Sequence, residues 1–316
     1  MTHEPYKKIA LAGATGNLGS VVLKELVDSG LFEVTVLTRE SSTNTFPSEV
    51  KVAKVNFESA ESLTQALAGI DALVSTVATL AISTQKLLID SAVAAGVKRI
   101  IPSEFGCDLH NPKTKALPVY AGKVEIEDYL KELSTKTNVS YTLIFNGPFL
   151  DWGLTNGLFF NFKERKVELF DGGDQPISSS RLSTVAKAVR RVLTHPPETA
   201  DRAIWVKDID VSQKQLLKLA RELTPGEEWE IKQVDTAALE KESLEQLAKG
   251  DIGPLTFFNL VRRAIFAPEY GGQFKYDHNA ILGIKSLKEE ELPGLVRAAF
   301  NWEEIVKSAT DGPYLP

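Results

Sequence analysis

The sequence predicts an α/β protein with a doubly wound parallel sheet. Short β-branched runs alternate with amphipathic helical stretches through the first half of the chain. Several of those helical stretches end near glycine, and a glycine-rich turn follows the first run. Strands and helices that alternate in this way are joined by right-handed crossovers, which produce a parallel sheet with helices on both faces.

The elements of the first half follow from the spacing of their apolar residues. Strands alternate every two residues or are continuously apolar, whereas amphipathic helices repeat every three to four residues. The predicted strands are residues 8–12, 33–37, 50–55, 72–77, 99–102 and 140–145. The predicted helices between them are residues 17–29, 59–68, 84–95 and 122–136.

The alternation loosens after about residue 150. Residues 152–163 are rich in aromatic side chains and uncharged until Lys163. The pattern then predicts helices at 183–193, 212–223, 236–248 and 254–266, and strands at 203–206 and 228–234. Because no linker separates the halves, we expect residues 1–150 to form the main sheet and residues 151–316 a smaller α/β lobe interleaved with it.

Composition and charge exclude several classes of protein. The 316 residues carry 36 basic and 42 acidic side chains, a net charge of −6 without basic clusters, so we expect no nucleic-acid partner. The longest uncharged stretch, residues 72–85, is too short for a membrane span. The predicted strand at residue 8 leaves no room for a signal peptide, so we expect a cytoplasmic protein. A single cysteine and four scattered histidines predict no metal site.

The turn after the first strand reads G-A-T-G-N-L-G at residues 13–19. In a Rossmann-type unit, Gly13 would permit the tight turn, Gly16 the approach of a pyrophosphate, and Gly19 close helix packing. The first N–H groups of the helix then face the phosphates. The residues expected to contact the cofactor here are Gly13, Thr15, Gly16, Asn17, Leu18 and Gly19. An ordinary strand-to-helix turn could use the same glycines, so the rest of the unit decides.

The end of the second strand supports a dinucleotide with an additional phosphate. The residue that meets the adenosine ribose lies about 20 positions after the last glycine, and here that residue is Arg39. A guanidinium suits a 2′-phosphate, whereas a carboxylate would suit a free hydroxyl. We therefore expect NADPH, with Ser41 as a further donor, although a surface arginine would look the same. Small residues that end the fourth strand, Ser75, Thr76 and Val77, should border the cofactor.

Beyond these features, I-P-S-E-F-G at 101–106, Gly122-Lys123, and N-G-P-F-L-D-W at 146–152 carry a family resemblance. With the glycine turn, they resemble the isoflavone reductase and phenylcoumaran benzylic ether reductase group, in particular its fungal members. These belong to the NmrA-like branch of the atypical short-chain dehydrogenases. The resemblance covers roughly residues 6–160. It implies an NADPH-dependent oxidoreductase, with an NADP-binding Rossmann domain at 1–150 and a substrate-binding lobe at 151–316.

The resemblance also assigns residues. It implies that Lys123 donates or accepts a proton while hydride passes from the cofactor to a conjugated, aromatic or phenolic small molecule. Further cofactor contacts would come from Ser103, Lys123, Asn146 and Pro148, and substrate contacts from Phe105, Phe149 and Trp152. A monomer or a homodimer is expected.

A lysine in an apolar cleft beside a cationic ring can act as this proton carrier, because burial and like charge both favour its neutral form. The Tyr-Lys pair of ordinary short-chain dehydrogenases, four residues apart, is absent, since Tyr120 and Lys123 are three apart. Acidic residues follow Lys123 on its helix, namely Glu125, Glu127 and Asp128. They motivate an alternative, an NmrA-like NADP(H)-sensing regulatory protein without turnover. A redox-neutral use of the cofactor, such as isomerisation, is a third possibility.

Other candidates have ordinary structural explanations. We expect Glu104 to cap backbone N–H groups, Cys107 to be inert, and His278 to lie on a surface loop. Phe159 and Phe160 are expected in the core.

Overall fold

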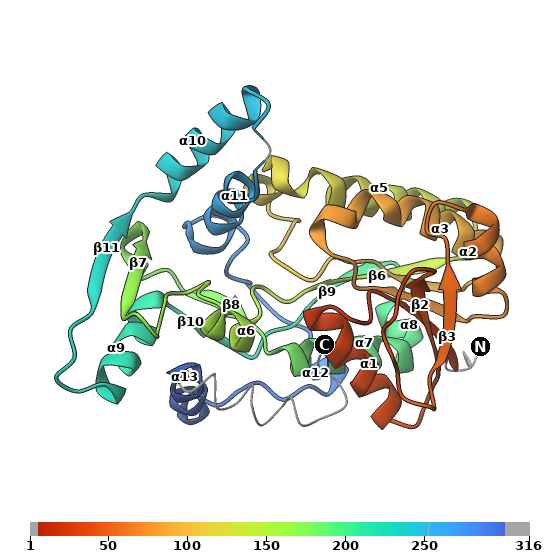
Figure 1. Ribbon diagram of the computed structural model, residues 1–316, viewed down its shortest axis with the longest axis horizontal. Coiled ribbons are helices and arrows are strands. Elements are labelled where there is room, and N and C mark those ends of the chain that lie inside the picture. The colour runs from red at the N-terminus through yellow and green to blue at the C-terminus, as the bar shows by residue number, and fades with distance from the viewer. Residues whose placement is uncertain (1–5, 252, 301–316) are drawn as a thin grey trace.

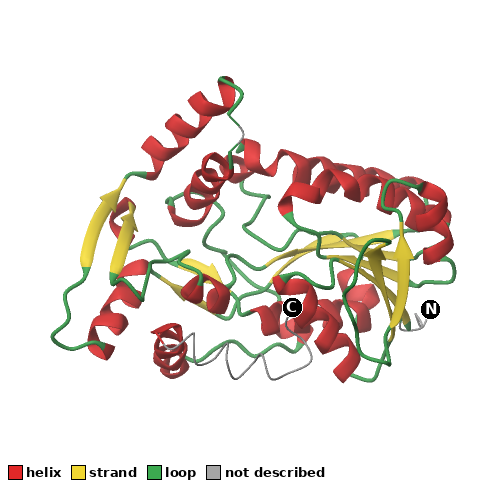
Figure 2. Cartoon of the chain, in the orientation of Figure 1, coloured by secondary structure: helices red, strands yellow, loops and turns green. Residues whose placement is uncertain are grey.

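The computed structural model describes residues 6–251 and 253–300, and its centre is a seven-stranded parallel sheet (Figures 1 and 2). The strand order is β3-β2-β1-β4-β5-β6-β9. The strands are β1 Lys8–Ala12, β2 Glu33–Arg39, β3 Lys51–Val55, β4 Ala72–Ser75, β5 Arg99–Ile101, β6 Ser140–Phe145 and β9 Arg202–Trp205. Strand β1 pairs with β2 on one side and with β4 on the other, so the order in which strands are added to the sheet reverses at β1. Doubly wound sheets bind ligands at this switch point. The predicted fold class is confirmed.

Helices cover both faces of this sheet, because successive apolar side chains of a strand such as β1 point to opposite faces and both faces must be buried. Ile9 and Leu11 point into one apolar core with α1 and α7, while Ala10 and Ala12 point into the other with α2, α3 and α5. In Figure 1 these two layers lie below and above the sheet. The helices are α1 Asn17–Asp28, α2 Ala60–Leu67, α3 Gln85–Ala94, α5 Ala121–Lys136 and α7 Leu182–Thr194.

The second half adds two small sheets beside the main one (Figure 2). Strands β7 (Lys166–Phe170) and β11 (Glu230–Val234) pair in parallel, and β8 (Ile177–Ser179) pairs antiparallel with β10 (Ile209–Val211). The remaining helices are α4 Pro112–Lys115, α6 Leu150–Thr155, α8 Pro196–Thr199, α9 Gln213–Leu223, α10 Thr236–Ala248, α11 Pro254–Phe266, α12 Asn279–Leu282 and α13 Leu292–Phe300. Short 3₁₀ turns are η1 Thr79–Thr84, η2 Pro118–Tyr120, η3 Asp171–Gly173 and η4 Glu289–Glu291.

Most predicted elements are found within two residues of their expected bounds, but some short ones were missed. Strands β7, β8 and β10 were not predicted, and the expected strand at 72–77 ends at Ser75, so Thr76 and Val77 lie in the following loop. Both β9 and α7 come from the second half, yet they complete the main sheet and one of its cores. The division at residue 150 stays a prediction. Among the described helices, none has the length and apolarity of a membrane span.

Candidate active site

The glycine turn between β1 and α1 is packed as closely as the sequence predicted. Gly13 has a φ of +85°, and a Cβ there would lie 2.6 Å from the Thr76 carbonyl oxygen. A Cβ on Gly19 would lie 2.0 Å from the Gly13 carbonyl oxygen. A Cβ on Gly16, however, would lie 3.5 Å from the Gly13 carbonyl oxygen, an ordinary contact distance. Gly13 and Gly19 are therefore required by packing, and Gly16 keeps the surface of the turn open.

Helix α1 begins with unused hydrogen-bond donors. Gly16 precedes the helix and provides no side-chain cap, and its first turn contains no acidic residue. The first N–H groups of a helix have no partner within the helix, so the turn formed by Thr15, Asn17 and Leu18 is suited to an anion. Arg39 lies exposed at the end of β2, followed by the exposed Ser41, and forms no ion pair with another described residue.

The ends of β4 and β5 are joined by hydrogen bonds. The Thr76 hydroxyl donates to the Ala12 carbonyl at 2.9 Å, and the Ser103 hydroxyl donates to the Val77 carbonyl at 2.7 Å. These two hydroxyls thus hold the loops in place. The Ser75 hydroxyl, in contrast, is buried and has no partner.

The end of β6 contributes another polar group without a partner. Asn146 is fully buried, its amide nitrogen donates to the Gly147 carbonyl at 2.6 Å, and its Oδ1 has no donor. Pro148 follows in the same loop and lines a cavity beside it. The predicted cofactor residues therefore lie at the carboxyl edge of the sheet, in the loops that follow the strands, in the first turn of α1 or on α5.

The cavity holds Lys123 among aromatic side chains. Its volume is about 190 Å³, and it brings together all three predicted substrate residues, Phe105, Phe149 and Trp152. Lys123 extends from α5 into it with a side chain that is 14% exposed. A Cβ on Gly106 would lie 3.6 Å from Lys123 Nζ, so the ammonium rests over the P-S-E-F-G loop.

Parts of this cavity were not predicted. Helix α11 closes one side with Phe258, Val261 and Ile265. Other lining residues that were not predicted are Cys107, Val119, Tyr120, Gly147 and Leu158. The amphipathic pattern of α11 predicted a helix with an apolar face, but nothing in a single sequence indicates which surface that face covers.

Glu104 is the carboxylate next to Lys123. Lys123 Nζ donates to the Glu104 backbone carbonyl and lies 3.8 Å from Glu104 Oε1. The side chain is 2% exposed, and Oε1 accepts no hydrogen bond. Burial raises the pKa of the Glu104 carboxyl from 4.5 to about 7, and Lys123 partly opposes this rise. The expectation that Glu104 caps backbone N–H groups is wrong, because no backbone N–H of the described residues donates to its carboxyl group.

The acidic residues that follow Lys123 face other partners. Glu127 accepts from Lys131 at 3.3 Å, and Asp128 pairs with Lys131 at 3.5 Å and Lys115 at 3.7 Å. Glu125 is exposed.

Two further side chains have structural roles. His278 is buried rather than in an exposed loop, because its Nδ1 accepts from the Trp205 backbone N–H at 3.2 Å. Its Nε2 lies 2.9 Å from an Arg202 nitrogen. Burial of Cys107 raises its thiol pKa to about 11, which agrees with an inert cysteine.

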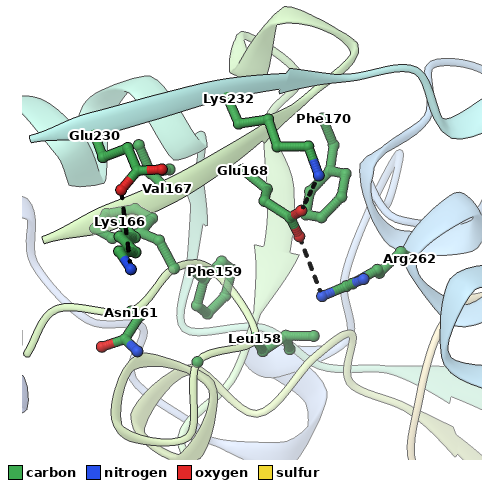
Figure 3. A pocket seen from close by; sticks show the side chains of 12 residues that line it. Leu158, Phe159, Asn161, Lys166, Val167, Glu168, Phe170, Glu230, Lys232 and Arg262 are labelled. Carbon is green, nitrogen blue, oxygen red and sulfur yellow. Dashed lines mark hydrogen bonds and ion pairs between the residues drawn. The ribbon is translucent and has the colours of Figure 1, made fainter. Parts of the chain in front are cut away.

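A second cavity, about 320 Å³, lies between β7, β11 and α11 (Figure 3). Its charged side chains largely pair with one another: Glu168 lies 3.0 Å from Lys232 and 3.4 Å from Arg262, and Lys166 lies 3.9 Å from Glu230. It contains neither Lys123 nor the glycine turn. The smaller cavity is therefore the candidate active site. Among the described residues, no group of three or more His, Cys, Asp or Glu side chains could hold a metal ion.

The glycine turn and the uncapped start of α1 form an anion-binding site at the switch point of the sheet, and the cavity with Lys123 lies at the same edge. This arrangement is typical of Rossmann-type oxidoreductases. The NmrA-like family model matches residues 5–155. Oxidoreductase aprR of Aspergillus flavus is 35% identical over 270 residues, covering 84% of this chain and 90% of the relative. The chain belongs to the NmrA-like family, and it is an oxidoreductase.

Two further matches agree with this family. Phenylcoumaran benzylic ether reductase PT1 of Pinus taeda is 28% identical over 216 residues, covering 63% of this chain and 68% of the relative. The leucoanthocyanidin reductase–NADPH complex of Vitis vinifera superimposes with a TM-score of 0.72 at 18% identity. That match covers 92% of this chain and 99% of the other, and it shows the shared fold. The family resemblance and the reductase group expected from the sequence are confirmed.

Proposed function

We propose that this oxidoreductase is an NADPH-dependent reductase that acts on a conjugated, aromatic or phenolic small molecule in the Lys123 cavity. The observation that carries the proposal is the position of Lys123. It extends into an aromatic-lined cavity at the edge of the sheet where the glycine turn lies. The leucoanthocyanidin reductase of Vitis vinifera, which has the same fold, forms a complex with NADPH, and this supports the same cofactor here.

The residues present fit this cofactor. The open surface at Gly16 and the uncapped start of α1 would hold the pyrophosphate, and Arg39 would hold the 2′-phosphate. The buried Ser75 hydroxyl and Asn146 Oδ1 have no hydrogen-bond partner among the described residues. Buried polar atoms are seldom left unpaired, so groups of a bound ligand at this edge would satisfy them. When bound, NADPH supplies hydride.

Lys123 would donate or accept the proton that accompanies hydride transfer. Its ammonium can donate to the oxygen of an enone, which polarises the conjugated system for hydride attack, or its amine can take a proton from a phenol. Phe105, Phe149 and Trp152 would hold a flat ring beside it, and the small apolar cavity would exclude water. Tyr120 is buried, and its pKa is raised well above the ordinary 10, so it stays protonated.

The alternative, an NADP(H)-sensing regulatory protein, is less well supported. It was motivated by Glu125, Glu127 and Asp128, and these side chains are exposed or pair with lysines other than Lys123. A lysine directed into an aromatic cavity is useful for turnover, whereas cofactor sensing does not need one. We further propose a cytoplasmic location and no macromolecular substrate.

The proposal is tested by NADPH oxidation with a panel of enones and phenolic ethers. The wild type should oxidise NADPH with at least one of them, and Lys123→Ala should lose turnover by 100-fold or more while still binding NADPH. Lys115→Ala, which removes a lysine that lies 3.7 Å from Asp128 and outside the cavity, is the matched control and should retain activity. Unchanged turnover in Lys123→Ala would reject the role of Lys123, and NADPH binding without oxidation would favour the sensor.

A further inference from the structure

The P-S-E-F-G loop places the buried carboxyl group of Glu104 next to the side-chain amine of Lys123 in the candidate active site. We propose that Glu104 is a positioning residue that holds Lys123 in the cavity and exchanges a proton with it. This inference rests on the proposed function for its role in turnover, but the contact between the two side chains is independent of that function.

The loop is built to make this contact. Phe105 has a φ of +37°, a left-handed conformation that is uncommon for a bulky residue. Backbone strain of this kind is typically found at functional sites. The Glu104 N–H donates to the Pro102 carbonyl at 2.8 Å, and the Glu104 carbonyl accepts from Lys123. Both the carbonyl and the carboxyl of Glu104 therefore lie next to the same ammonium.

Among the described residues, Lys123 is the one cation within 4 Å of the Glu104 carboxyl. Glu104 Oε1 is buried without a hydrogen bond and lies 3.8 Å from Lys123 Nζ. A buried carboxylate without a donor is costly, so the acid form is favoured unless an adjacent cation compensates. The pKa of about 7 agrees with a carboxyl that can release or hold a proton near neutral pH.

Several titratable groups surround Glu104 and influence it. Glu127 raises its pKa by like charge, whereas Lys123 and Lys131 lower it. Glu104 in turn raises the pKa of Tyr120. The groups that face it, from η2 and α5, are Tyr120, Lys123, Glu127 and Lys131.

The proton step is balanced. Reduction of an enone adds a hydride from the cofactor and a proton from Lys123, which leaves a neutral amine. The O–H bond of the Glu104 acid then breaks and an N–H bond forms on Lys123, giving an ammonium beside a carboxylate. Solvent returns a proton to Glu104 before the next turnover. If Lys123 instead takes a proton from a phenol, the same exchange runs in the opposite direction.

The first test needs no turnover. Lysines are labelled by reductive methylation with ¹³C, and the Lys123 methyl signal is identified by its absence in Lys123→Arg. With neither cofactor nor substrate present, this signal should change with an inflection near pH 7 in the wild type. The inflection should disappear in Glu104→Gln. It should persist in Glu125→Gln, which changes an exposed glutamate on α5, the helix that carries Lys123. An inflection that survives in Glu104→Gln, or none in the wild type, would overturn the proposal.

A second variant keeps the test valid if Glu104→Gln does not fold. Glu127→Gln removes a like charge that raises the pKa of Glu104, so the Lys123 inflection should move to lower pH. An unchanged inflection would contradict the coupling.

The second test is the pH profile of kcat. Glu104→Gln should lower kcat by at least tenfold and lose the break near pH 7, and Glu104→Asp should restore part of both. A uniform decrease with the wild-type break retained would indicate a purely structural role and overturn the proton exchange. If the wild type shows the methyl inflection but reduces no substrate, the proposed function fails and the contact between Glu104 and Lys123 stands.

Discussion

At the scale of single residues, Arg39 should determine which nicotinamide cofactor the protein prefers. Its guanidinium is exposed at the end of β2 and unpaired among the described residues, so it can bind a 2′-phosphate without first breaking another interaction. Hydrogen bonds to charged groups contribute about 1.5–3 kcal/mol, which corresponds to roughly 10- to 100-fold in affinity.

Arg39→Ala should therefore weaken NADPH binding by roughly 10- to 100-fold and leave NADH binding almost unchanged. Calorimetric titration measures both dissociation constants. Lys51→Ala, which removes a cation at the opposite end of the adjacent strand β3, is the control. Equal losses for the two cofactors would contradict the assignment of Arg39.

Glu104 should also leave a signature in stability. Its pKa of about 7 in the folded state lies above its ordinary 4.5, so between these values the folded state keeps a proton that the unfolded state releases. The stability that the protonated Glu104 carboxyl contributes to the folded state is fully present below pH 4.5, and it is lost as the pH rises through 7. The loss is on the order of 3 kcal/mol, at 1.36 kcal/mol for each pKa unit.

Glu104→Gln removes this dependence, because the amide does not titrate. Its melting temperature relative to the wild type should therefore rise between pH 5.5 and pH 8. Glu125→Gln should show no such trend. Thermal unfolding at both pH values measures the difference between the two melting temperatures. A difference that stays the same from pH 5.5 to pH 8 would show that Glu104 is already ionised at the lower pH.

At the scale of elements, the β1–α1 turn separates packing from ligand binding. Gly19→Ala would place a methyl group 2.0 Å from the Gly13 carbonyl oxygen, whereas Gly16→Ala would place it 3.5 Å away. Overpacking typically costs about 1–3 kcal/mol, so Gly19→Ala should lower the melting temperature by several degrees.

Gly16→Ala should leave the melting temperature of the free protein nearly unchanged and weaken NADPH binding at least tenfold, because its methyl group would meet the pyrophosphate. Thermal shift with and without NADPH compares the two variants. If Gly16→Ala binds NADPH normally, the pyrophosphate does not lie over this turn.

The elements also show how far the sequence could be interpreted. The strand-turn-helix unit and Arg39 follow from local patterns, and Lys123 follows from the family resemblance; the structure brings them to the same edge of the sheet. Strands β8 and β10 have three residues each and depend on a partner distant in sequence, so no local period indicates them. The contact between Glu104 and Lys123 depends on the left-handed backbone of Phe105, which an ordinary phenylalanine does not predict.

At the scale of the whole molecule, the two halves of the chain share a core. Val185, Val189 and Val192 of α7 and Ile204 of β9 belong to the same apolar cluster as Ile9 of β1. A fragment of residues 1–155 would expose that face. We expect it to show no cooperative thermal transition and no NADPH binding, as measured by circular dichroism and calorimetry. A cooperative transition in this fragment would show that the first half folds independently.

A crystal structure with NADPH bound would test the proposed site most directly. The pyrophosphate should lie at the first N–H groups of α1, the 2′-phosphate against the Arg39 guanidinium, and the nicotinamide at the mouth of the cavity that holds Lys123. A nicotinamide directed away from Lys123, or a cofactor in the cavity between β7, β11 and α11, would contradict it.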